Sequence, residues 1–413
     1  MITKDVALGE GVIIAQPDLV NLYGCSIGAG TKVGAFVEIR RTVRIGAHCK
    51  IQAFAFIPEG VEIGDGVLIG PHVCFTNDLF PRAVDADGRP LRSEDWEIVP
   101  TRVGDGAAIG ANATILCGLH IGAFSLVGAG AVVTANVPPH AIVVGNPARI
   151  IGDTRHRGSN LPDFLQSAQG FGKAPETRLG RRAAAVTEEP LIILGLGGNS
   201  LGALDAALEA RRAGLASWQV MGFLDDRPQP DGAKFHGFPI LGRLDDAWRF
   251  TDASFVNGIG GVQSFRNRPD FIARTGLPPE RFATVVHPRA TVSPLARVGI
   301  GCILLANSVV CAEAVVGDHV VVLENSVVNH NVTAGDHTLI AASVSISGFV
   351  AIEPETYIGC GSTIRQQVRI GRGALVGMGS VVLNDVPPGQ VVVGNPARLL
   401  REHPVTGRVT TSG

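Results

Sequence analysis

Three short segments of the sequence contain residue types that could carry out chemistry. The first ends in His330, and imidazole suits proton transfer because its unperturbed pKa lies near neutral pH. The second, Phe75-Thr-Asn-Asp-Leu-Phe-Pro-Arg82, places an amide beside a carboxylate. The third, Gly195-Leu-Gly-Gly-Asn-Ser200, precedes an amphipathic stretch, and backbone N–H groups at a helix N-terminus can bind phosphate. The elements around these segments must position them, and the first two lie inside a repeat.

Aliphatic or aromatic residues recur at every sixth position, from Ile27 to Phe75, from Val103 to Val133 and from Val286 to Val382. Glycine often follows them, and the chain has 53 glycines in 413 residues, so a tight turn is expected every few residues. Short strands joined by such turns stack into a solenoid with one continuous core. With three sides of six residues, the tracts predict about five and nearly six coils. Coils of 18 residues would stack Gly348 on His330, although an ordinary solvent-facing corner residue is the alternative for that histidine.

The pattern changes between the two tracts. Residues 153–188 are polar and aperiodic and are predicted to be a linker. Their basic cluster, Arg178, Arg181 and Arg182, could touch phosphate but is expected to be solvated. A buried strand at 191–194, a helix at 201–213 and a strand at 220–224 then predict a βαβ unit.

Composition excludes several classes of protein. With 46% hydrophobic residues and a net charge of −2, the chain is not disordered. Lys and Arg total 35 against 37 Asp and Glu, so no nucleic-acid partner is expected. The 7 cysteines include no CxxC pair, which argues against a zinc site or a disulfide framework and favours small buried side chains. No apolar leader or membrane span is evident, and a cytoplasmic location is expected.

Both tracts resemble the hexapeptide-repeat acyltransferases. The resemblance implies left-handed parallel β-helices, a homotrimer, acetyl-CoA as cosubstrate and no metal. The tracts also finish alike, with Gly-x-Gly and Gly-Asn-Pro-Ala-Arg segments that line the acetyl-CoA groove in that family. The implied cofactor-binding residues are Gly128, Gly130, Arg149, Gly377, Gly379 and Arg398. These segments are also expected to cap the solenoid edge, which is compatible with the groove, and a purely structural solenoid is the alternative to an acyltransferase.

Residues 190–400 resemble the PglD-type nucleotide-4-amino-sugar N-acetyltransferases. The resemblance rests on four segments: Gly195 to Ser200, Gly222-Phe-Leu-Asp-Asp226, Val256-Asn-Gly-Ile-Gly260 and Val327-Val-Asn-His330. It implies that His330 is the general base and that the Gly348 amide faces the thioester oxygen. It also implies a nucleotide-sugar site with these residues: Gly195, Gly197, Gly198, Asn199, Asp225 and Asp226. Asn331 stands where the family often has an acid, so either the second site is expected to be slower or another acid such as Asp336 is expected to orient the imidazole.

Residues 1–152 resemble the N-acetyltransferases of dTDP-3-amino-3,6-dideoxyhexoses. The shared segments are Gly70-Pro-His-Val-Cys-Phe75 and the stretch that follows it, which opens an excursion of 26 residues, counted from residue 77 to 102. Long loops in regular solenoids are usually functional. In those relatives the residues at Asn77 and Asp78 contact the sugar amine, and the proton passes to the departing sulfur. Arg82 is a further substrate-binding candidate, and His72 is either an extra base or a corner residue.

The predicted fold is mainly β. It consists of two left-handed β-helices, at 1–152 and 284–400, a Rossmann-like nucleotide-sugar-binding domain at 189–283 between them, and a tail at 401–413. The predicted function is bifunctional acetylation of 3-amino and 4-amino groups on dTDP- or UDP-linked deoxysugars for surface polysaccharide. Two alternatives stay open. The C-terminal half could be a non-catalytic binding or oligomerisation module, or the glycine-rich turn could belong to a dehydrogenase, although Ser200 occupies the third glycine position.

Overall fold

The computed structural model describes residues 1–84, 88–91, 97–156 and 188–402. The chain forms two compact units, Met1–Gly172 and Lys173–Gly413, which are described separately. Most of the predicted linker, its arginine cluster (Arg178, Arg181 and Arg182) and the end of the tail lie outside the described residues. Within the described residues, none of the helices has both the length and the apolarity needed to cross a lipid bilayer.

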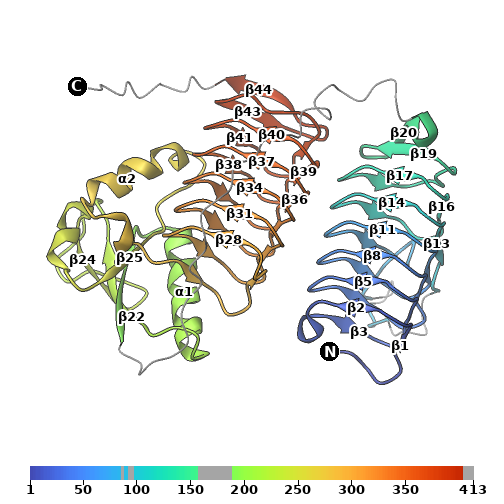
Figure 1. The fold of residues 1–413 in the computed structure, drawn as a ribbon, viewed down its shortest axis with the longest axis horizontal. Helices are drawn as coiled ribbons and strands as arrows, with labels where there is room; N and C mark the ends of the chain where they lie inside the picture. Colours follow the sequence, from blue (N-terminus) through green and yellow to red (C-terminus); the bar gives the residue numbers. More distant parts are fainter. Residues whose placement is uncertain (85–87, 92–96, 157–187, 403–413) are drawn as a thin grey trace. The chain divides into compact units, whose positions relative to one another are not determined.

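The first unit is a parallel β-helix with three sheets, shown in blue to green in Figure 1. One sheet consists of β1 (Ala7–Leu8), β4 (Ser26–Ile27), β7 (Arg44–Ile45), β10 (Val61–Ile63), β13 (Thr101–Val103) and β16 (His120–Ile121). The second consists of β2 (Ile13–Ile14), β5 (Lys32–Val33), β8 (Lys50–Ile51), β11 (Leu68–Ile69), β14 (Ala108–Ile109), β17 (Leu126–Val127), β19 (Ala141–Val144) and β20 (Arg149–Asp153). The third consists of β3 (Asn21–Leu22), β6 (Glu38–Ile39), β9 (Phe56–Ile57), β12 (Cys74–Phe75), β15 (Thr114–Ile115) and β18 (Val132–Val133).

The repeat explains this architecture. Most of these strands bury one aliphatic residue that stacks on the one 18 positions earlier, as Ile45 stacks on Ile27. The first coil does not follow the six-residue register, because the 3₁₀ turn η1 (Pro17–Leu19) precedes Leu22. The insertion breaks the spacing, although Leu22 is fully buried in the same core. The register therefore begins before Ile27.

The excursion after β12 is shorter than expected. Strand β13 pairs with β10, so Thr101 and Arg102 already belong to a coil. Phe75 and Val103 are 28 positions apart instead of six, which makes the insertion 22 residues long rather than 26. The two ends of the insertion are hydrogen-bonded to each other, because the Val99 N–H donates to the Asn77 carbonyl at 3.0 Å.

Both β-helices end in an antiparallel hairpin. In the first unit β19 pairs with β20, and the 3₁₀ turn η3 (Thr154–His156) follows. The first unit therefore continues to His156, four residues into the predicted linker. In the second unit β43 (Gln390–Val393) pairs with β44 (Arg398–Glu402) in the same way.

The second unit contains a longer β-helix, drawn in orange to red in Figure 1. Its sheet G consists of β26 (Val285–Val286), β29 (Ile303–Leu304), β32 (Val321–Val322), β35 (Leu339–Ile340), β38 (Tyr357–Ile358), β41 (Leu375–Val376), β43 and β44. Sheet H consists of β27 (Thr291–Val292), β30 (Val309–Val310), β33 (Val327–Val328), β36 (Ser345–Ile346), β39 (Thr363–Ile364) and β42 (Val381–Val382). Sheet I consists of β28 (Arg297–Val298), β31 (Val315–Val316), β34 (Thr333–Ala334), β37 (Ala351–Ile352) and β40 (Arg369–Ile370).

An α/β subdomain precedes this β-helix in the second unit. Its five-stranded sheet has the order β23 (Lys234–Phe235), β24 (Phe238–Gly242), β22 (Trp218–Leu224), β21 (Glu189–Leu194) and β25 (Ser254–Asn257). Strands β24, β22, β21 and β25 are parallel. The helices and 3₁₀ turns are α1 (Gly198–Arg212), η5 (Leu244–Arg249), η6 (Phe265–Asn267), α2 (Arg268–Arg274) and η7 (Pro279–Arg281). The predicted βαβ unit corresponds to β21, α1 and β22.

The α/β subdomain and the second β-helix share a hydrophobic core. Helix α1 lies between the subdomain's sheet and the first coils of the β-helix (Figure 1). Its Ala203 and Ala207 belong to one buried cluster with Leu305 and Leu339 of the β-helix. The opposite face of the subdomain's sheet packs against η5 and α2. This common core fixes the subdomain against sheet G.

Candidate functional site

His330 lies at the corner between sheets H and I. Residues 327 and 328 of β33 pair with 345 and 346 of β36, which places Gly348 directly over His330 in the next coil. A Cβ atom at Gly348 would lie 2.6 Å from Cε1 and 2.9 Å from Nε2 of the imidazole. Glycine is therefore the residue that leaves room for the ring, and the stacking expected from the 18-residue coil is confirmed.

Two hydrogen bonds orient the imidazole. His330 Nδ1 lies 3.0 Å from Asn331 Oδ1, and Asn331 Nδ2 donates to Glu313 Oε2 at 2.6 Å. The expectation that Asp336 orients the ring is wrong. Asp336 Oδ1 accepts the backbone N–H of Asp318 at 2.9 Å, because it lies at the corner between sheets I and G. Glu313 reaches the imidazole through Asn331 instead, and the sequence analysis did not identify it.

The surroundings of His330 leave one side of the ring accessible. The side chain is exposed, and the ring of Phe349 meets it edge to face at 5.2 Å. Across the described part of the chain, no acceptor is found for the Gly348 N–H. The corner therefore offers a proton acceptor and a backbone donor next to each other.

The glycine-rich turn lies at the carboxyl edge of the subdomain's sheet. Strand β22 lies on one side of β21 and β25 on the other, and ligands of open parallel sheets bind where the strand order reverses. Gly195 has a φ of 91°, and a Cβ there would collide with Ile259, so its role is to form the turn. Gly197 and Gly198 have no atom within 4 Å of their Cβ positions. Open space therefore lies above the N-terminus of α1.

Other predicted residues of this edge are engaged by the protein. Asn199 Nδ2 donates to the Gly260 carbonyl at 2.9 Å. Asp225 is buried, accepts the Leu196 N–H at 3.1 Å and pairs with Arg227. Asp226 pairs with Arg274 at 2.6 Å. These contacts hold the turn in place, and a cavity of about 330 Å³ opens beside the two aspartates, lined by residues 225–232 and 240–243.

A buried cationic cluster joins the subdomain to the β-helix. Arg268 is fully buried and donates to the carbonyls of Ile259 and His319, each at 2.7 Å. His319 stacks on His337 at 5.2 Å and packs edge to face on Phe282. Burial, together with Arg268, lowers the pKa of His319 to about 4, and burial with His319 and Arg268 lowers that of His337 to about 4. Both histidines are corner residues, and His319 is buried rather than solvent-facing.

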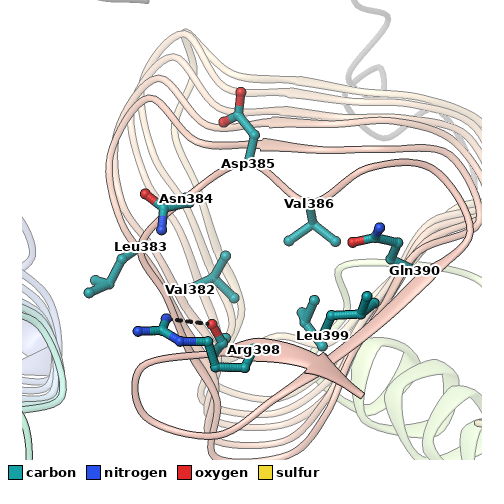
Figure 2. Close-up of a pocket in the computed structure, with 10 residues that line it drawn as sticks. Val382, Leu383, Asn384, Asp385, Val386, Gln390, Arg398 and Leu399 are labelled. Atoms are coloured by element: carbon teal, nitrogen blue, oxygen red, sulfur yellow. Dashed lines mark hydrogen bonds between the residues drawn. The ribbon is translucent and has the colours of Figure 1, made fainter. Parts of the chain in front are cut away.

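The C-terminal segments of the two units share one geometry. A Cβ at Gly128 would collide with Val144, and a Cβ at Gly377 would collide with Val393. Both glycines therefore allow the C-terminal hairpin to pack closely on the last coil. Gly130 and Gly379 have φ values of 64° and 66°. Arg149 and Arg398 each donate to the preceding carbonyl and expose their side chains. In the second unit a cavity of about 320 Å³ lies between the last coil and the hairpin, with Asn384, Gln390 and Arg398 among its lining residues (Figure 2).

In the first unit, Asn77 and Asp78 begin the excursion. Asp78 Oδ1 accepts the Phe80 N–H at 2.8 Å, which fixes the turn. Arg82 is exposed a short distance beyond. His72 is a corner residue whose ring stacks on Phe54 at 4.6 Å.

The structure adds Glu59 to the residues of this corner. Strand β9 pairs with β12 in the register 56 to 74, so Glu59 lies one coil below Asn77. Strands β18 and β42 are the matching last strands of their sheets in the two units. Three coils before them, Glu59 of the first unit occupies the position of His330 in the second, and one coil later Asn77 occupies the position of Gly348. The sequence analysis missed Glu59 because the insertion hides this correspondence.

The cysteines differ in their exposure to solvent. Cys25, Cys49, Cys117 and Cys302 are buried as expected, but Cys360 is exposed, so that prediction was wrong for one corner residue. Among the described residues, no group of three or more His, Cys, Asp or Glu side chains is arranged to hold a metal ion.

Comparisons with known proteins agree with the repeat architecture. The family model "Bacterial transferase hexapeptide (six repeats)" matches residues 42–77. The model "Hexapeptide repeat of succinyl-transferase" matches residues 100–135 and 350–384. A curated relative, "Bifunctional protein GlmU" of Xanthomonas campestris pv. campestris, is 29% identical over 162 residues, or 35% of this chain and 35% of the relative. The chain thus spans about a third of the length of the curated relatives that it matches.

Two solved structures are similar to about half of the chain. The acetyltransferase domain of PglB from Neisseria gonorrhoeae is 31% identical, covers 51% of this chain and 100% of that chain, and has a TM-score of 0.45. The GDP-perosamine N-acetyl transferase of Caulobacter crescentus is 24% identical, covers 53% of this chain and 100% of that chain, and has a TM-score of 0.46. The six-residue register and the stacked parallel strands of each β-helix therefore agree with the family models, and both β-helices contain the hexapeptide repeat that these models describe in bacterial transferases.

Proposed function

We propose that the chain is a bifunctional nucleotide-sugar N-acetyltransferase. The second unit acetylates a 4-amino group and the first unit a 3-amino group of a nucleotide-linked deoxysugar, with acetyl-CoA as the acetyl donor. The observation that carries the proposal is the His330 corner, where an exposed imidazole is oriented through Nδ1 and stacked on the one glycine that makes room for it. The similar structures from Neisseria and Caulobacter, solved with acetyl coenzyme A and with CoA and GDP-perosamine, suggest the same substrate classes.

The geometry supports a direct transfer. His330 Nε2 takes a proton from the sugar amine as the amine nitrogen attacks the thioester carbonyl carbon. The Gly348 N–H stabilises the negative charge that develops on the carbonyl oxygen. The carbon–sulfur bond then breaks, and the thiolate leaves with the proton that the imidazolium returns. The products are the acetamido sugar and free CoA, so the proton count balances.

The α/β subdomain is proposed to be Rossmann-like and to hold the nucleotide. Its glycine turn presents N–H groups at the start of α1, a 15-residue helix, and the space over Gly197 and Gly198 would admit a diphosphate. The subdomain covers sheet G, whereas His330 lies at the corner between sheets H and I, which is the vertex opposite that sheet. A sugar held by the glycine turn would thus meet the His330 corner of another copy, which supports a homotrimer with shared sites.

The first unit is proposed to work without a protein histidine. Asn77 and Asp78 supply polar groups for the amine, and Glu59 places a carboxylate at the position that His330 occupies in the other unit. In this reading the proton passes to the departing sulfur. The matching hairpins of the two units, with Arg149 and Arg398 exposed, would each meet a CoA phosphate by a charge-assisted contact.

The proposal is tested with the full chain and a 3,4-diamino sugar nucleotide plus acetyl-CoA. His330→Ala is expected to reduce acetylation at position 4 to a small residual rate and leave position 3 unaffected, and Asn77→Ala is expected to do the reverse. Mass spectrometry with fragmentation locates the acetyl group. Loss of neither activity would overturn the assignment. Retention of 4-acetylation in His330→Ala would instead make the second unit a binding module.

A further inference from the structure

We infer that Glu313 is a positioning residue for His330, acting through the amide of Asn331. The inference rests on the proposed base role of His330. It concerns a carboxylate 17 positions away in sequence that the sequence analysis did not identify, and it explains how an active site works with an amide where an acid is expected.

Glu313 and Asn331 occupy equivalent positions in successive coils. Their φ values are 59° and 58°, and they are 18 residues apart, so their side chains project from the same corner. The Asn331 N–H donates to the Ala312 carbonyl at 3.3 Å, which holds the two turns in register. The 2.6 Å contact between Asn331 Nδ2 and Glu313 Oε2 follows from this stacking.

The chemistry of the two groups decides which way the amide points. An ionised carboxylate only accepts hydrogen bonds, so Glu313 must meet the NH₂ end of Asn331. The carbonyl end of Asn331 then faces His330 Nδ1, at 3.0 Å. A carbonyl oxygen only accepts, and the proton of the neutral imidazole must therefore lie on Nδ1. The lone pair on Nε2 is left for the substrate, next to Gly348.

Among the described residues, the Asn331 side chain is hydrogen-bonded to His330 and Glu313, so without Glu313 the amide can turn over. A reversed Asn331 would offer its NH₂ group to Nδ1 and favour the tautomer with the proton on Nε2, which cannot accept one from an amine. Because a single net hydrogen bond in a solvent-accessible place is worth about 1 kcal/mol, removal of Glu313 is expected to lower the ratio of the active to the inactive tautomer about fivefold. Asn331 alone is thus insufficient to hold the active tautomer of His330, and Asn331 together with Glu313 replaces the missing acid.

Three variants of the full chain test the inference. Glu313→Ala should lower kcat for 4-acetylation by up to about fivefold, without changing KM for either substrate. Asn331→Asp should rescue the Glu313→Ala variant, since a carboxylate at 331 accepts the Nδ1 proton in either orientation. The same Asn331→Asp change in the presence of Glu313 should give lower activity than it gives in the Glu313→Ala variant, because two carboxylates would then face each other.

Glu355→Ala is the matched control. Glu355 also has a left-handed backbone, with a φ of 60°, and it pairs with Arg372 at 2.8 Å at another corner of the same β-helix. This variant loses an equivalent surface contact, so it should shift thermal stability as Glu313→Ala does but leave kcat unchanged.

The tautomer itself can be observed without activity. ¹⁵N chemical shifts of the His330 ring should show a protonated Nδ1 in the original chain and a mixture in Glu313→Ala. An unchanged tautomer ratio, or an equal effect of Asn331→Asp with and without Glu313, would overturn the inference. If no acetyl transfer is detected while the tautomer shifts as expected, the proposed function fails and the positioning role stands.

Discussion

Replacement of Gly348 by alanine should impair catalysis far more than folding. The new Cβ would lie 2.6 Å from Cε1, 2.9 Å from Nε2 and 3.1 Å from Nδ1 of His330. Non-bonded carbon atoms prefer separations of about 3.5–4.0 Å, so the imidazole must move by about 1 Å. That displacement stretches the 3.0 Å bond to Asn331 beyond hydrogen-bonding range.

The cost to catalysis follows from that movement. A misplacement of about 1 Å in a catalytic group can reduce the rate about 100-fold, which corresponds to about 2.7 kcal/mol of transition-state stabilisation. The free energy of unfolding should change by less than about 1 kcal/mol. The His330 ring is exposed, and the backbone of Gly348 does not adopt a positive φ, so alanine introduces no backbone strain.

The assay is the initial rate of CoA release with a 4-amino sugar nucleotide, measured for both single variants and for His330→Ala combined with Gly348→Ala. In the double variant the clash is gone, so Gly348→Ala should have no further effect on the residual rate. Full activity of Gly348→Ala would refute the reasoning. An equally large loss in the His330→Ala background would show that the glycine acts by some other route.

Two further outcomes are expected. The pKa of His319 in the folded chain, about 4, lies below the unfolded value of 6.5, so its contribution to stability is complete above pH 6.5 and is lost as the pH falls toward 4. The loss by pH 5 should be about 2 kcal/mol, and it should be reduced in His319→Asn, in calorimetric scans of the second unit's transition between pH 7 and pH 5. A transition with the same pH dependence in that variant would contradict this. Asp225→Asn should weaken the hold on Leu196 and raise KM for the sugar nucleotide several-fold with kcat unchanged, whereas a fall in kcat alone would contradict a loop-holding role.

The periodicity alone predicted two solenoids of short strands and much of the His330 corner. Buried positions such as Ile27 and Ile45 repeat because each coil must place an aliphatic residue on the one below, and this requirement is local enough to be visible as a six-residue register. The same arithmetic stacked Gly348 on His330. It failed where the register slips, at the first coil and at the insertion after Phe75.

Tertiary structure alone decided which side chains meet at the corners. Asp336 and Glu313 are both acids near His330 in sequence, but they belong to different vertices of the triangular coil, so only Glu313 reaches Asn331. Likewise, His319 is buried because Arg268, 51 positions earlier, lies against its corner. A repeat specifies where each residue stands within its coil. Contacts between coils and with the α/β subdomain depend on backbone conformation and packing, which bring together residues that the period does not relate.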